Sequence, residues 1–139
     1  MASVEIINIY ELDKKARDDF KDFSHNGTNS FYRSEMKAGR LSLYGVIIDG
    51  LRIGSIGLRH DEMPHGGEMV VVAGGGTYRG QRLVPMVLDF LERFAVKYGE
   101  KSIRFHTKRE ALAILTMGLG YSEIDDGDPD EITMRKVLA

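Results

Sequence analysis

The sequence predicts an α+β fold in which helices pack on a mixed β-sheet. A short apolar, β-branched run at residues 69–73 leads through three glycines into a long amphipathic helical pattern. Asp49-Gly50 separates two strand-like runs and is the strongest short signal for a hairpin. Strand and helix patterns follow one another in the order β-α-α-β-β-β-α-β-α-β-β, which is typical of this class.

The first half of the chain predicts one strand, two helices and the hairpin. Residues 3–9 alternate weakly between apolar and polar side chains, as a half-buried strand does. Four apolar residues then share one helical face, and a polar, glycine-containing segment at residues 24–27 stops that helix. The four residues are Leu12, Ala16, Phe20 and Phe23. The remaining elements expected here are a short helix over residues 29–38 and strands over 41–48 and 51–58.

The second half predicts a loop over residues 60–67 and then a strand that the glycines 74–76 end. Pro85 fits only the first turn of a helix, so the following helix begins at residues 83–85. Its expected apolar stripe is Leu83, Val87, Phe90, Leu91, Phe94 and Tyr98. A strand over 102–106, a helix over 111–119, and strands over 121–124 and 131–138 complete the chain.

Composition limits the classes of protein that fit. A chain of 139 residues is expected to form one domain over residues 1–139. A net charge of −2 gives no global attraction to nucleic acid or to an anionic membrane. The absence of cysteine excludes disulfides and thiolate catalysis. No apolar run reaches ~18–20 residues and no secretory signal is visible, so we expect a cytoplasmic location and no membrane partner.

The turn before the long helix is the first candidate site. Free backbone N–H groups and the positive end of the helix dipole point outward where a loop opens a helix. This arrangement suits a phosphate or a carboxylate. The loop reads Arg79-Gly80-Gln81-Arg82-Leu83-Val84.

The element order and this loop resemble the GNAT family of acetyl-CoA-dependent N-acyltransferases. The resemblance covers nearly the whole chain, is best from Glu68 to Tyr121, and implies a mostly antiparallel sheet with helices on both faces. It also implies that the loop at residues 79–84 and the backbone of Val72, Ala73 and Gly74 bind coenzyme A. Arg82 and Val84 stand where the family has glycines. Either the loop shifts and Arg82 pairs with phosphate, or coenzyme A binds weakly or not at all.

The resemblance also implies catalytic positions. Glu68 precedes Arg79 by eleven residues, as the general-base glutamate does in the histone acetyltransferase branch; alternatively it is an exposed residue at a strand start. Thr116 occupies the position of the usual tyrosine acid, although its hydroxyl is a poor proton donor. His106 is the nearest substitute, or a histidine satisfied at a strand end. Arg109 could join a basic rim for the cofactor's phosphates.

Other residues leave alternatives open. Phe31, Tyr32 and Arg33 sit where the family's first helices border the acceptor pocket, or they form a packed helix face. The histidines and carboxylates of residues 60–65 do not follow a recognised ligand spacing, so we expect no metal site. Two function classes follow: acetyl transfer to an amine, or a non-catalytic descendant such as a phage virion or host-interaction protein. The C-terminal strands could pair across a homodimer.

Overall fold

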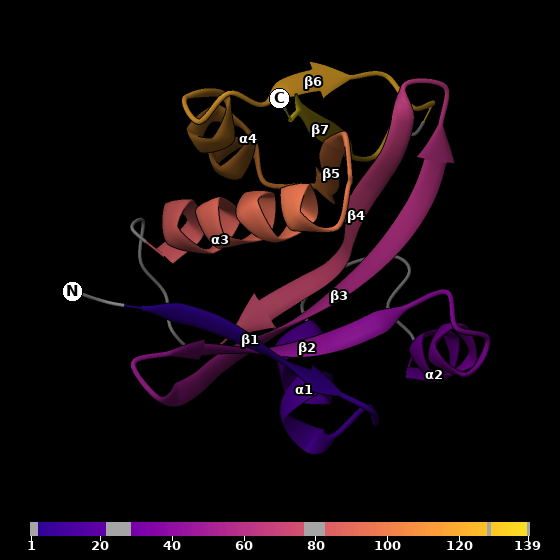
Figure 1. The fold of residues 1–139 in the computed structure, drawn as a ribbon, viewed down its shortest axis with the longest axis vertical. Helices are drawn as coiled ribbons and strands as arrows, with labels where there is room; N and C mark the ends of the chain where they lie inside the picture. Colours follow the sequence, from indigo (N-terminus) through magenta and orange to yellow (C-terminus); the bar gives the residue numbers. More distant parts are fainter. Residues whose placement is uncertain (1–2, 22–28, 77–82, 128, 139) are drawn as a thin grey trace. The chain divides into compact units, whose positions relative to one another are not determined.

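The structure, a computed structural model, describes residues 3–21, 29–76, 83–127 and 129–138. Its elements follow the order expected from the sequence, which confirms the α+β class (Figure 1). The helices are α1 (Lys14–Phe20), α2 (Asn29–Lys37), α3 (Leu83–Lys97) and α4 (Glu110–Met117). The strands are β1 (Val4–Ile9), β2 (Ser42–Ile48), β3 (Leu51–Met63), β4 (Gly66–Gly76), β5 (Ser102–Thr107), β6 (Ser122–Ile124) and β7 (Ile132–Val137).

The strands form one sheet with the hydrogen-bonded order β1-β2-β3-β4-β5-β7-β6. β1 pairs antiparallel with β2, β2 with β3, β5 with β7 and β6 with β7, whereas β4 and β5 run parallel. Parallel neighbours need a crossover connection, and the segment that contains α3 supplies it. The sheet is therefore mostly antiparallel with one parallel pair, as the sequence predicts.

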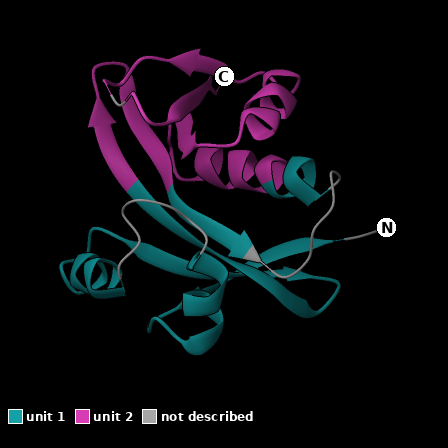
Figure 2. Ribbon diagram, turned by 180° about the vertical axis from the view of Figure 1, so that it is seen from behind, with its two compact units in different colours: residues 1–59, 72–87 teal, residues 60–71, 88–139 magenta. Residues whose placement is uncertain are grey.

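The chain divides into two compact units, drawn in two colours in Figure 2. The N-terminal unit contains residues 1–59 and 72–87, and the C-terminal unit contains residues 60–71 and 88–139. The expectation of a single domain over residues 1–139 stays a prediction.

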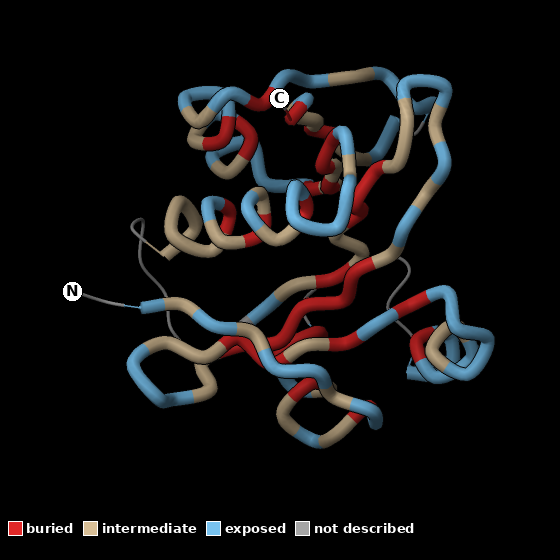
Figure 3. Tube along the Cα trace, viewed as in Figure 1, coloured by how far each residue is buried: buried red, intermediate tan, exposed pale blue. Residues whose placement is uncertain are grey.

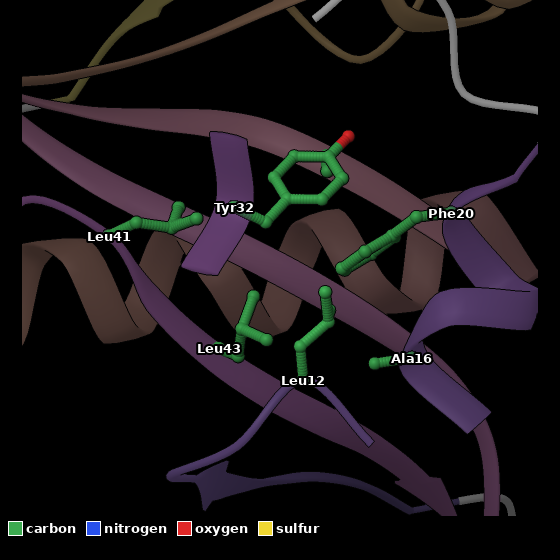
Figure 4. Close-up of a cluster of buried hydrophobic side chains, with 7 residues drawn as sticks. Leu12, Ala16, Phe20, Tyr32, Leu41 and Leu43 are labelled. Atoms are coloured by element: carbon green, nitrogen blue, oxygen red, sulfur yellow. The ribbon is translucent and has the colours of Figure 1, made fainter. Parts of the chain in front are cut away.

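In the N-terminal unit, α1 and α2 pack on one side of the strands through a cluster of buried side chains (Figure 4). The Asp13 side chain begins α1, because it accepts a hydrogen bond of 2.9 Å from the backbone N–H of Ala16. The rings of Phe20 and Tyr32 lie 5.3 Å apart between their centroids and join the two helices. Burying each large apolar side chain contributes roughly 1.5–3 kcal/mol. The cluster comprises Leu12, Ala16, Phe20, Tyr32, Leu41, Leu43 and Ala73.

In the C-terminal unit, α3, β5 and β7 each contribute a fully buried, large apolar side chain. Leu91, Ile103 and Met134 have at most 1% of their surface exposed. The predicted stripe of α3 is only partly right, because its buried residues are Leu88, Leu91 and Ala95. Tyr98 lies beyond the end of α3 and is 64% exposed. No helix within the described residues has the length and apolar character needed to cross a bilayer.

Two expectations about the chain around β4 are wrong. The segment 60–67 is not a loop, because β3 extends to Met63 and β4 begins at Gly66. Its polar side chains alternate between half-buried and exposed, as strand residues do (Figure 3). The glycines 74–76 do not end the strand, since β4 continues through Gly76. Phe23, expected at the end of the first helix, lies outside the described residues.

Candidate functional site

Among the described residues, the pairing of β4 with β5 ends before β4 itself does. The parallel pairing with β5 runs from Glu68 with Ser102 to Val71 with Phe105, and β4 then continues to Gly76. In the pairing that the described residues make, the β4 backbone beyond Val71 has no β5 partner. Unpaired N–H and C=O groups on a strand edge can bind an extended, amide-containing chain. This edge includes Val72, Ala73 and Gly74, and their contact with the pantetheine arm of coenzyme A stays a prediction.

The glycines of β4 have distinct roles. A Cβ atom on Gly75 would lie 1.9 Å from the backbone oxygen of Asp19, so only glycine allows α1 to approach this strand so closely. A Cβ atom on Gly74 would meet only Ile56 at 3.8 Å, an ordinary contact distance. The interpretation of residues 74–76 as a flexible turn is therefore wrong. These residues are a strand against which α1 packs.

The expected phosphate loop is only partly described. Arg79, Gly80, Gln81 and Arg82 lie outside the described residues. α3 begins at Leu83, which confirms the predicted helix start with Pro85 in the first turn. Leu83 and Val84 are the first two residues of α3, and both are half-buried. The binding of diphosphate at residues 79–84 stays a prediction.

Glu68 lies fully buried in a network of four hydrogen bonds. Oε1 accepts from the guanidinium groups of Arg104 at 2.7 Å and Arg135 at 2.9 Å. Oε2 accepts from Arg135 at 2.5 Å and from the hydroxyl of Ser102 at 2.6 Å. Arg104 also pairs with Asp61 at 2.9 Å. The interpretation of Glu68 as an exposed residue at a strand start is therefore wrong, because none of its surface is exposed.

The strand register explains the network. Arg104 and Arg135 are direct cross-strand partners, so their like charges would repel without a carboxylate between them. Burial acts to raise the pKa of Glu68, but hydrogen bonds from Arg135 and Ser102 and the charges of both arginines outweigh it, and the pKa lies below its ordinary value. A carboxylate accepts about four hydrogen bonds, and Glu68 already has four donors. It is a stable anion whose lone pairs are occupied.

His65 extends this network to the surface. Its Nε2 atom lies 2.7 Å from the Ser102 hydroxyl and 3.8 Å from Oε2 of Glu68. Ser102 has one proton, which it donates to Glu68, so the ring nitrogen must donate to the Ser102 oxygen. When the ring is neutral, its proton is therefore on Nε2 and its lone pair on Nδ1. The side chain of His65 is 37% exposed.

Sequence reasoning missed Ser102, Arg104 and Arg135 in this network. A signal for two of them was present, because Ser102, Arg104 and His106 alternate within a buried strand and so share one polar face. No comparable signal existed for Arg135. Its part depends on the register between β5 and β7.

The other predicted catalytic residues lie elsewhere. Nε2 of His106 lies 2.8 Å from a carboxylate oxygen of Asp126, as expected of a histidine satisfied at a strand end. Thr116 is fully buried, and its hydroxyl donates to the Ala113 carbonyl in the same helix. This burial and the hydrogen bond within α4 indicate that Thr116 is a packing residue. Arg109 is exposed immediately before α4, where its side chain does not cap the helix. The catalytic roles of His106 and Thr116 stay predictions.

The predicted acceptor residues on α2 differ in position. Tyr32 is fully buried in the N-terminal core, and burial raises the pKa of its hydroxyl. Phe31 is 36% exposed and packs edge-on against Tyr32. Arg33 lines an open groove of about 640 Å³ in the N-terminal unit. Of these three residues, only Tyr32 is too deeply buried to contact a ligand.

The histidines and carboxylates near the β3–β4 turn are engaged in separate contacts. His60 lies between two carboxylates, with Nε2 2.6 Å from Glu62 and Nδ1 2.7 Å from Glu100. The hydrogen bond with Glu62 is the main cause that raises the pKa of His60, and Glu100 adds to it. Within the described residues, no group of three or more such side chains is arranged to hold a metal ion.

No family model and no curated protein matches this sequence. Solved structures of GNAT acetyltransferases, however, have the same fold. A probable acetyltransferase from Staphylococcus epidermidis matches over 100% of both chains with a TM-score of 0.74 and 8% identity. A GNAT family acetyltransferase from Elizabethkingia anophelis with acetyl-CoA bound matches over 97% of this chain and 98% of its own, with a TM-score of 0.71 and 14% identity.

An acetyltransferase from Bacillus subtilis in complex with CoA matches over 99% of this chain and 100% of its own, with a TM-score of 0.69 and 16% identity. The fold of the chain is therefore the GNAT fold, in a divergent sequence.

Proposed function

We propose, on the premise that the chain has the GNAT fold, that it transfers an acetyl group from acetyl-CoA to an amine. The observation that carries the proposal is the β4 edge beyond Val71, where the pairing of the described residues with β5 has ended. The three residues expected to contact the cofactor lie on that edge, and α3 begins where a phosphate-binding loop should end. Two solved structures with this fold contain acetyl-CoA or CoA.

Residues 79–84 would hold the diphosphate, and Val72, Ala73 and Gly74 would hold the pantetheine arm through their backbone groups. Arg82 would replace the close approach that glycine permits with a guanidinium–phosphate pair. The bound thioester would supply an activated acyl carbon. The acceptor amine, a cytoplasmic location and a homodimer stay predictions.

The family resemblance implies that Glu68 removes the amine proton. Glu68 already has four hydrogen-bond donors, so it would have to exchange one of them for the amine to act as the base. The base would take one proton from the amine as the nitrogen–carbon bond forms and the carbon–sulfur bond breaks, and the proton would then pass to the sulfur.

Titration with acetyl-CoA tests the cofactor. We expect acetyl-CoA to raise the melting temperature, because a ligand at 100 times its dissociation constant stabilises the native state by about 2.7 kcal/mol. Arg82→Ala should weaken binding by about 1–3 kcal/mol, because a charged hydrogen bond to phosphate is lost. Calorimetric titration of both proteins measures the difference.

Arg93→Ala is the matched control, because it removes an arginine that pairs with Asp89 on the exposed face of α3. Its affinity should equal that of the parent. A parent protein that does not bind millimolar acetyl-CoA contradicts the transferase proposal. That result favours the second class, a binding or structural protein such as a phage component. The observation that supports this class is the presence of Arg82 and Val84 where the family has glycines.

A further inference from the structure

We propose that the open groove of the N-terminal unit binds an amphipathic oxyanion, a carboxylate or a phosphate monoester that carries an apolar chain. The groove has a volume of about 640 Å³, within the range of about 300–1,000 Å³ common for small-molecule sites. It lies among the end of β1, α1, α2 and the start of β2. The proposal is independent of acetyl transfer.

The floor of the groove is apolar. Leu12, Leu41 and Leu43 line it and belong to the buried cluster of this unit. Ile9 and Met36 line it as well and are only partly buried. Leu12, Leu41 and Leu43 are at most 6% exposed, so the apolar chain of a ligand would cover mainly the exposed surface of Ile9 and Met36.

The charged lining of the groove is mainly positive. Arg33 and Lys37 come from α2, four residues apart and so on one helix face, and Arg17 comes from α1. Arg17 is held in place, because its guanidinium donates to the Leu12 carbonyl at 3.0 Å. Glu11 is the one carboxylate among the lining residues described. Because the charge of Arg17 is partly offset by Asp13 and Asp18, the positive character of the lining comes mainly from Arg33 and Lys37, and it favours a negatively charged ligand.

Nearby carboxylates do not neutralise these cations through direct contacts. Asp13 pairs with Arg52 at 2.6 Å, Asp18 with Lys14 at 3.1 Å and Asp19 with Lys15 at 2.7 Å. On α2, Glu35 pairs with Arg40 at 2.6 Å. Among the contacts of the described residues, Arg33 and Lys37 have no carboxylate partner, and both are exposed. Their donors are available to an oxyanion, for which guanidinium geometry is well suited.

Binding of eight-carbon probes to the full chain tests the proposal. We expect octanoate and octyl phosphate to raise the melting temperature, and the tighter of the two identifies the head group. Octanol and octylamine should give no shift, since they lack the negative charge. Acetate should bind much more weakly than octanoate, because it cannot cover the apolar floor.

The double variant Arg33→Ala, Lys37→Ala should weaken binding of the better probe by at least about tenfold, because the charged hydrogen bonds to the oxyanion would be lost. Lys14→Ala is the matched control: it removes an exposed cation of α1 outside the groove and should bind like the parent. Equal binding by the double variant overturns the proposal. So does an equal shift with octylamine, equal affinity for acetate, or binding to anionic lipid vesicles without binding to monomeric octanoate.

Discussion

At the scale of single residues, the central feature is the carboxylate of Glu68 with its two arginines. Removing one partner of a buried ion pair is costly, because the remaining charge stays buried without compensation. Glu68 is also the base that the family resemblance implies, so one carboxylate would serve both the sheet and the reaction. Stability and turnover separate these two roles.

Glu68→Gln should lower the free energy of unfolding by about 3–5 kcal/mol, because Arg104 and Arg135 would lose their shared anion. Chemical denaturation measures this loss, and Glu123→Gln on the exposed edge strand β6 is the control that should change little. Glu68→Gln should also reduce kcat with any accepted amine, because glutamine cannot take the amine proton. Unchanged kcat in Glu68→Gln, with acetyl-CoA still bound, contradicts the role of Glu68 as the base and leaves the transferase proposal intact.

At the scale of elements, α1 and β4 are in unusually close contact. The Asp19 carbonyl lies where a side chain on Gly75 would begin, and the Asp19 carboxylate accepts a buried hydrogen bond of 2.7 Å from Ser55 on β3. The close backbone contact with Gly75 and the hydrogen bond with Ser55 therefore both hold α1 against the strands. The triple glycine reads as a turn in the sequence because glycine is the usual turn residue. Here one of the three is needed for packing.

Gly75→Ala should lower the free energy of unfolding by about 1–3 kcal/mol or more, because backbone atoms must move to admit the methyl group. Gly74→Ala is the matched control. Its methyl group has room, and we expect no loss, or a gain of about 0.4–1 kcal/mol from the stiffer unfolded chain. Denaturant midpoints compare the two, and equal midpoints contradict the packing role of Gly75.

At the scale of the whole molecule, stability should depend on pH in two directions. The pKa of Glu68 is lowered on folding, so its contribution is present above about 4.5 and is lost as the pH falls through the folded-state pKa. The pKa of His60 is raised, so its contribution is present below about 6.5 and is lost as the pH rises through the folded-state pKa. Stability should therefore be greatest between these values.

Urea midpoints across the pH range measure this profile. His60→Gln should flatten the decline on the alkaline side and leave the decline on the acid side unchanged. The alkaline effect should be small, because the side chain of His60 is 52% exposed and solvent screens its ion pairs. An alkaline decline of the same size in His60→Gln contradicts the assignment.

The sequence by itself determined the order of the elements, the hairpin at Asp49-Gly50 and the start of α3. These features depend on local periodicity and turn chemistry, which neighbouring residues carry. It misjudged residues 60–67, because their polar composition resembles a loop, whereas β3 and β4 extend through most of this segment and Asp61 pairs with the distant Arg104.

Only the tertiary structure decided which side chains meet. Glu68, Ser102 and Arg135 are far apart in the chain, and the register of β4, β5 and β7 brings them together. That register depends on which face of each strand is buried, which a single strand's pattern does not specify for its partners. The structure therefore shows Glu68 as a paired, buried anion and Gly75 as a packing residue, although each has an ordinary local sequence.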